Sequence, residues 1–181
     1  MSNTTKVIRD TPLQEITLRR YEKPANLAGR QLLKKLCLSL GLLQPGDSRD
    51  VIVDVLYVLL RAKNSQSNAQ NSGKNNTLQD QQTQNLNIVQ NLLSSEDIVK
   101  LVIEYRKQEN LQLRGIASSN IRRQIKRLRN LYLVEKITNN YRITEHQKLH
   151  DTFEEKVEKF MLASMLARVK EYMHAVDQEF S

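Results

Sequence analysis

The stretch that most restricts the possible folds of this chain is a strongly basic segment followed directly by a hairpin pattern, at residues 118–142. It reads SSNIRRQIKRLRNLYLVEKITNNYR, and together with Arg114 it holds eight Lys or Arg residues against one acid, Glu135. These residues carry seven of the chain's eight net positive charges. A charge concentrated on one element in this way is typical of a surface that binds a polyanion.

The first half of this segment predicts an amphipathic helix over residues 119–130. Its apolar positions recur at helical spacing and are Ile121, Ile125 and Leu128, with either Leu131 or Tyr132 one turn further. The opposite side presents Ser119, Asn120, Arg123, Lys126, Arg127 and Asn130, while Arg122, Gln124 and Arg129 flank the apolar stripe. The basic face is therefore expected to point away from the core.

The second half predicts a short β-hairpin. Leu133–Ile137 has the pattern of a strand, Thr138–Asn140 that of a turn, and Tyr141–Thr144 that of a returning strand. Asn tolerates the left-handed backbone conformations that tight hairpins use. Such a hairpin would bring Lys136 and Arg142 near its tip, where both charges can reach a phosphate.

Two helices are expected near the N-terminus. A proline at the first helical position predicts a short helix over Pro12–Tyr21, and Asn26 is expected to cap a second helix with Lys34 and Lys35 facing outward. The expected inward positions are Leu13, Ile16 and Tyr21 in the first helix, and Leu32, Leu33, Leu36 and Leu40 in the second. Cys37, the only cysteine, lies among these leucines, so we expect a buried thiol, and an intramolecular disulfide is excluded.

A third helix is expected over residues 48–62, where Val and Leu cover most of the surface. Asp50, Asp54 and Arg61 share one polar stripe, so Asp54 is predicted to face water. The composition then changes, because 15 of the 28 residues at 64–91 are Asn or Gln. Such a tract buries too little apolar surface to offset the entropy of ordering it. It predicts a disordered insertion or, alternatively, an interdomain linker.

The elements from residue 48 onward resemble winged helix-turn-helix DNA-binding regulators of prokaryotic, particularly archaeal, type. In this mapping 48–62 resembles the first helix, and 94–108, with Ser94 and Asp97 at capping-box spacing, resembles the second. Leu92 and Leu93 resemble the short strand that pairs with the wing, and Ser119–Asn130 resembles the recognition helix, reached through about ten residues around Gly115. A different mapping starts at Ser94 with its second helix at 111–117, but seven residues make a poor helix.

The resemblance implies a mainly α fold, a winged helix-turn-helix with a small β-hairpin wing, N-terminal helices and a long C-terminal helix. The implied domains are an N-terminal helical extension (1–47), the winged-helix domain (48–144) with its insertion (64–91), and a C-terminal helix for dimerisation (145–181). It further implies sequence-specific binding of double-stranded DNA by a transcriptional regulator, with the third helix in the major groove.

The same resemblance nominates the residues that contact DNA. Side chains near the amino end of the recognition helix reach base edges, which indicates Ser119, Asn120 and Arg123, because Asn pairs with adenine and Arg with guanine. The more distant basic residues would neutralise phosphates. The complete expected DNA-binding set is Ser119, Asn120, Arg122, Arg123, Lys126, Arg127, Lys136, Asn139, Asn140 and Arg142.

The chain after the hairpin predicts one long helix, because neither Gly nor Pro recurs after Gly115, and Thr144 and Gln147 have capping-box spacing. An apolar seam steps by 4, 3, 4, 3 and 4 residues through Leu162, Leu166, Val169, Met173, Val176 and Phe180, after an offset stripe of Leu149, Phe153, Val157 and Phe160. The seam predicts a homodimer that reads two half-sites about 34 Å apart. The alternative is that it packs back on the N-terminal helices.

Other chemistry has little support in the sequence. His146 and His150 are four residues apart without a third His or a Cys nearby, so neither a metal nor another cofactor is expected. No phosphate-binding loop or catalytic triad is recognisable, so an enzyme is not expected. The N-terminus is unlike a signal peptide and the apolar run at 51–60 is short, which favours a cytoplasmic protein. The alternatives are a winged-helix adaptor that assembles protein complexes and RNA binding, for which aromatic stacking positions are lacking.

Overall fold

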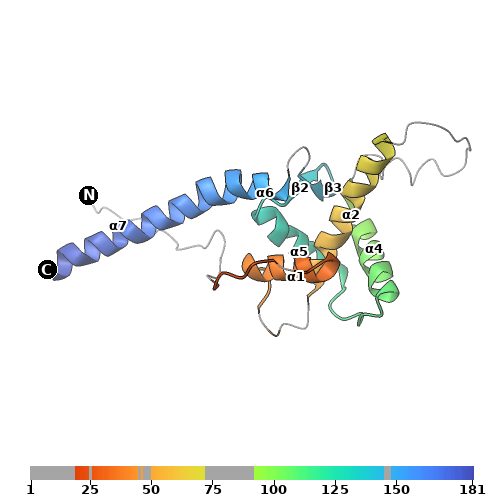
Figure 1. The fold of residues 1–181 in the computed structure, drawn as a ribbon, viewed down its shortest axis with the longest axis horizontal. Coiled ribbons are helices and arrows are strands. Elements are labelled where there is room, and N and C mark those ends of the chain that lie inside the picture. Colours follow the sequence, from red (N-terminus) through yellow and green to blue (C-terminus); the bar gives the residue numbers. More distant parts are fainter. Residues whose placement is uncertain (1–18, 25, 45, 47–49, 72–91, 145–147) are drawn as a thin grey trace, which may run out of the picture.

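The computed structural model describes residues 19–24, 26–44, 46, 50–71, 92–144 and 148–181. In this part the chain is mainly helical, with one small antiparallel sheet, as the sequence predicts (Figure 1). A group of helices lies beside the sheet, and the C-terminal helix extends away from them (Figure 1).

Helix α1 (Gly29–Ser39) begins later than expected. Asn26, the predicted cap, has a positive φ of 52° and lies ahead of the helix. The N-cap is Ala28, whose side chain cannot accept a hydrogen bond, so the prediction of this cap was wrong. The helix expected at 12–21 lies outside the described residues except for its last three, which are not helical, and Tyr21 is exposed rather than buried.

One face of α1 packs on the core. Leu33, Cys37 and Leu40 follow helical spacing along this face, with Cys37 and Leu40 buried and Leu33 partly buried. Leu32 is 40% exposed, so its predicted inward position was wrong. The reason is that the buried face is centred on Cys37, which leaves Leu32 at its edge.

Helix α2 (Val51–Asn71) is the central helix of the fold. Six consecutive residues from its start, 51–56, are buried, so the first turns of α2 are covered on all sides. The expected start at Ser48 lies outside the described residues. The helix continues through 64–71, so the Asn- and Gln-rich tract is not disordered from residue 64 as predicted, because a helix already nucleated by packing extends at low cost. The remainder of the tract, 72–91, lies outside the described residues.

Asp54 of α2 is fully buried, which contradicts the prediction that it faces water. Its carboxylate oxygens accept hydrogen bonds from Arg30 Nε at 2.8 Å and from Arg106 Nε at 2.6 Å. Asp50, one turn earlier, pairs with the same two arginines at 2.8 and 3.3 Å. Burial opposes ionisation of Asp50, but Arg30 and Lys34 outweigh it and lower the pKa of that carboxyl. Buried carboxylates need such partners, and this network joins three helices.

Strand β1 (Leu93–Ser94) leads directly into helix α4 (Ser95–Gln108), which completes this network through Arg106. The predicted capping box of α4 is confirmed. Ser94 Oγ accepts a hydrogen bond from the Asp97 amide at 3.1 Å, and the Asp97 carboxylate accepts one from the Ser94 amide at 3.3 Å. The buried residues of α4 are Ile98, Val102, Tyr105 and Arg106.

The connection at 109–117 is held by the same buried arginine. Arg106 Nη1 donates to the carbonyls of Gln112 and Arg114, at 2.7 and 2.9 Å. Gly115 has a φ of 74°, and a Cβ at this position would lie 3.2 Å from a valine side chain of α2. The network around Asp54 therefore also fixes the backbone that leads into helix α5 (Ser118–Asn130).

Strands β2 (Val134–Ile137) and β3 (Asn140–Ile143) form the predicted hairpin. Ile137 pairs with Asn140, so the turn between them has two residues, and Thr138 in that turn has a φ of 55°. Asn140 was expected in the turn and is instead the first residue of β3. On its other side β3 pairs with β1, as expected, which gives the strand order β1-β3-β2.

A single long helix follows the hairpin, as predicted (Figure 1). It consists of α6 (Leu149–Thr152), the π-helical segment η1 (Phe153–Leu162) and α7 (Ala163–Phe180), with helical backbone angles at both junctions. Thr144 is not its cap: the N-cap is Lys148, and the Thr144 hydroxyl donates to the carbonyl of Tyr132 at 2.8 Å. Gln147, the other half of the expected capping pair, lies outside the described residues.

Only the first part of this helix packs on the rest of the chain. Leu149 and Phe153 contact the core and Val157 is fully buried, but Phe160 is 69% exposed instead of continuing the stripe. Because i→i+5 bonding places more residues in each turn, the stripe drifts out of its α-helical phase across η1. None of the residues of α7 is buried.

One hydrophobic cluster unites the helices and the sheet. Cys37, Leu56, Ile98, Ile121 and Ile143 come from five different elements, and each is at most 3% exposed. Burial raises the pKa of the Cys37 thiol to about 12. Within the described residues no helix has both the length and the apolar character that crossing a membrane requires.

Candidate nucleic-acid interface

Helix α5 separates an apolar face from a basic face, as its sequence predicts. Ile121, Ile125 and Leu128 are at most 1% exposed. Leu131 continues this stripe and is fully buried, while Tyr132 is 44% exposed. The basic residues of the helix are Arg122, Arg123, Lys126, Arg127 and Arg129, and it contains no acid. All of these except the half-buried Arg127 are exposed.

A chain of hydrogen bonds between side chains runs along α5. Asn120 Nδ2 donates to the carbonyl of Gly115 at 2.6 Å, and Gln124 Nε2 donates to Asn120 Oδ1 at 2.9 Å. Arg127 Nη1 then donates to Gln124 Oε1 at 3.1 Å. These hydrogen bonds were not predicted from the sequence, although spacings of four and three residues on one helix face are a signal for such pairs. Asn120 keeps one N–H and one lone pair for a further partner.

Arg123 and Arg127 lie one turn apart and border a pocket of about 360 Å³ that reaches inward to Leu43 and Ile52. Arg127 is oriented by its bond to Gln124. By contrast, no described residue forms a hydrogen bond or ion pair with the side chains of Arg123, Lys126 and Arg129. A ligand would therefore meet the oriented guanidinium of Arg127 and three further positive charges. Within the described part of the chain, these three charges have no counter-ion.

Arg122 differs from the other bases because it turns toward α4. Its Nη2 lies 2.9 Å from Glu96 Oε1 and its Nε donates to Ser95 Oγ at 3.4 Å. The backbone amide of Glu96, then Ser95 and Arg122, lower the pKa of the Glu96 carboxyl. Both charged side chains are more than half exposed, so the pair is weak and can open for another partner. Ser119, at the amino end of α5, is exposed.

The hairpin offers fewer charges than expected. Lys136 on β2 and Asn139 in the turn are exposed. Arg142, however, donates to Glu135 across the hairpin at 2.7 Å and is 17% exposed, so its charge is matched within the hairpin. Asn140 is half-buried because β3 lies between the other two strands.

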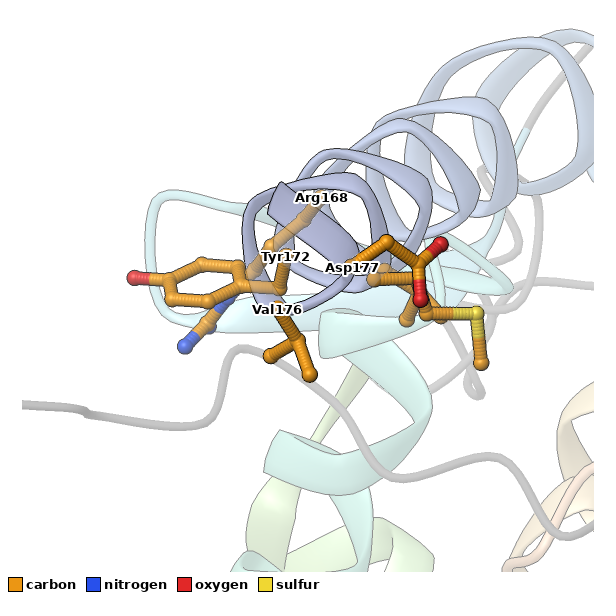
Figure 2. Close-up of a pocket in the computed structure, with 6 residues that line it drawn as sticks. Arg168, Tyr172, Val176 and Asp177 are labelled. Atoms are coloured by element: carbon orange, nitrogen blue, oxygen red, sulfur yellow. The ribbon is translucent and has the colours of Figure 1, made fainter. Parts of the chain in front are cut away.

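The seam expected to dimerise is uncovered in the single chain. Its exposed members, 44% to 84% accessible, are Leu166, Val169, Met173, Val176 and Phe180, while Leu162 at the end of η1 is half-buried. Figure 2 shows Val176 projecting between Tyr172 on one side and Asp177 on the other. Among the described residues the alternative, packing of the seam on an N-terminal helix, is not seen, because α7 has no buried residue.

No group of three or more potential metal ligands occurs among the described residues. His150 is 80% exposed, and its Nε2 lies 4.0 Å from a Glu154 carboxylate oxygen, while His146 lies outside the described residues. Comparison with protein-family models, curated proteins and solved structures found no match to this chain. A functional conclusion therefore depends on the geometry and charge of α5 and the hairpin.

Proposed function

We propose that the chain is a winged helix-turn-helix protein that binds double-stranded DNA through α5 and the hairpin, as a transcriptional regulator. The element order α2, β1, α4, α5, β2, β3 and the strand order β1-β3-β2 support this fold. The observation that carries the proposal is the charge of α5, which holds five bases, four of them exposed, and no acid. An inert solvated face usually mixes charges of both signs, which limits self-repulsion.

The amino end of α5 adds to this electrostatic field. Its first turn contains no acid, and Ala117 at the N-cap offers no side-chain acceptor, so the amide groups there are available to an anion. Arg123 lies near this end and can reach a base edge or a phosphate. Lys126, Arg127 and Lys136 would contact phosphates. Asn120 would read a base only through the N–H and lone pair that its internal bonds leave open.

Affinity for duplex DNA across a salt series tests this proposal with the variants Arg123→Ala and Lys126→Ala. We expect Arg123→Ala to lose about 1–3 kcal/mol of binding free energy, with relaxed preference at one base pair. Lys126→Ala should weaken binding to all sequences and reduce the slope of log affinity against log salt by about 1, because one fewer counter-ion is released.

Lys107→Ala is the matched control. Lys107 is an exposed residue of α4, so the variant removes the same charge outside α5 and the hairpin and should bind almost as the parent does. Parent-like affinity and salt slope in both α5 variants would reject the proposed surface.

The exposed seam of α7 favours a second candidate, a winged-helix adaptor that assembles protein complexes. That function predicts a stoichiometric protein partner bound through α7. It also predicts that duplex affinity stays at a non-specific level, about 10⁻⁴ to 10⁻⁶ M, and is the same for every sequence. Selection of bound fragments from random duplex DNA separates the two candidates, because only a regulator enriches a defined site.

A further inference from the structure

We infer that α7 pairs with α7 of a second copy of this chain, as a parallel coiled coil. The face that the second copy covers consists of Leu162, Leu166, Val169, Met173, Val176 and Phe180. A contiguous apolar stripe that stays exposed on a helix marks a contact surface, and here the chain's own core ends before α7 begins. The inference concerns the assembly and holds whether or not the protein binds DNA.

The seam has the period of a coiled coil. With Leu166, Met173 and Phe180 at the a positions, Leu162, Val169 and Val176 fall at the d positions. The π-helical segment ends at Leu162, so the rest of the seam lies on a regular α-helix and keeps its phase. At 1.5 Å per residue the seam is roughly 27 Å long.

The residues beside the seam match a second copy in parallel orientation. Tyr172 takes a g position and Asp177 an e position, and Figure 2 shows them on opposite sides of Val176. In a parallel pair each g residue faces the next e residue of the other helix. Tyr172 therefore faces Asp177 of the second copy, whose carboxylate can accept a hydrogen bond from the Tyr172 hydroxyl, and symmetry makes this contact twice. Met165, at the preceding g position, likewise faces Lys170, an e residue of the second copy. No like charges therefore meet in the parallel pair.

An antiparallel pair that keeps all six seam residues in contact is less favourable. It would be centred on Glu171, with Leu166 opposite Val176 of the second copy. In that arrangement Lys170 lies against Lys170 of the second copy on one flank. Like charges that face each other across a seam repel, and the nearest acid on that flank, Asp177, lies two helical turns away from Lys170. Charge therefore selects the parallel orientation.

Orientation decides where the two basic faces lie. In one chain α7 points away from α5 and the hairpin (Figure 1). Parallel pairing puts both copies of α5 at the same end of the coiled coil, whereas antiparallel pairing puts them at opposite ends. Only the parallel arrangement presents two basic faces to neighbouring half-sites of one duplex.

Disulfide trapping in the full chain tests the inference with Val176→Cys. Two cysteines at a d position meet across a parallel coiled coil, so mild oxidation should convert most of this variant into a linked dimer. Glu171→Cys is the control, since residue 171 lies on the outer face of α7, and it should stay monomeric on a denaturing gel. The native Cys37 is fully buried, so the oxidised parent protein should show no linked dimer.

Other outcomes would overturn the inference. A link that forms only when Leu166→Cys protein is mixed with Val176→Cys protein would establish the antiparallel arrangement instead. A monomeric mass for the parent protein in light scattering would reject the pairing of α7. The double variant Arg123→Ala with Val176→Cys should link as well as Val176→Cys alone. If DNA binding fails and trapping succeeds, the proposed function falls while this inference stands.

Discussion

Asp54 places a carboxylate in the centre of the helical core, between the guanidinium groups of Arg30 and Arg106. The polar stripe that Asp54 shares with Asp50 and Arg61 predicts that its side chain is exposed, because helical periodicity reflects only the residues of the same helix. The two arginines that neutralise Asp54 lie 24 and 52 residues away in the sequence. No local pattern indicates such a pairing, so the position of this residue could not be predicted.

At the level of single residues, we predict that Asp54→Ala lowers the free energy of unfolding by about 3–5 kcal/mol, since the buried Arg106 loses its nearest counter-charge. Urea denaturation followed by circular dichroism measures the loss. Glu22→Ala is the matched control, because its carboxylate also lies 2.8 Å from a cation, Lys35, but is 65% exposed. Its expected cost is below about 1 kcal/mol. Equal losses in the two variants would contradict the role of burial.

The elements that follow from the sequence are those whose determinants lie within a few residues of each other. The capping box of α4 needs only Ser94 and Asp97, and the hairpin needs a two-residue turn that tolerates a positive φ. The apolar stripe of α5 was likewise predicted residue by residue. The π-helical phase of η1 was not, because ten residues are too few for its longer period to be told from that of an α-helix. The predicted stripe failed at Phe160 for this reason.

At the scale of elements, Ser94→Ala should cost about 1 kcal/mol of stability, because it removes the side-chain acceptor of the α4 capping box. The neighbouring Ser95→Ala is the control. Among the described residues, the hydrogen bonds of the Ser95 hydroxyl are with the exposed Glu96 and Arg122, so its loss should stay within about 0.5 kcal/mol. Thermal and urea unfolding of both variants measure the difference, and a Ser95→Ala loss as large as that of Ser94→Ala would refute the assignment of the cap.

At the scale of the whole molecule, the described helices α1, α2, α4 and α5 share one core with the sheet, and α1 contributes Cys37 to it. The leucines around this residue predict a buried thiol, and this prediction is confirmed. A reagent reaches the thiol only when the core opens, because helices and sheet pack against each other in one cluster. Cys37 therefore reports on the opening of the molecule rather than on a local site.

We predict that a thiol reagent labels native Cys37 far more slowly than the unfolded chain at pH 8. The unfolded thiol ionises near pH 9, whereas the native thiol has a pKa of about 12. The contribution of Cys37 to stability is therefore fully present below pH about 9 and falls as the pH rises from 9 toward 12. Labelling rates at increasing urea concentration measure the protection of the native thiol, and the same series at higher pH measures the fall in stability. Rapid labelling without urea would show that α1 is not part of the core.

Residue spacing by itself determined the two faces of α5, the cap of α4 and the hairpin, because each depends on neighbours within one or two turns of chain. Tertiary structure decided the burial of Asp54 between the guanidinium groups of Arg30 and Arg106. It also decided that α7 has no buried residue in the single chain. These outcomes depend on which groups distant elements bring together, since a charge or an apolar face is stabilised by its surroundings in space and not by its position in the sequence.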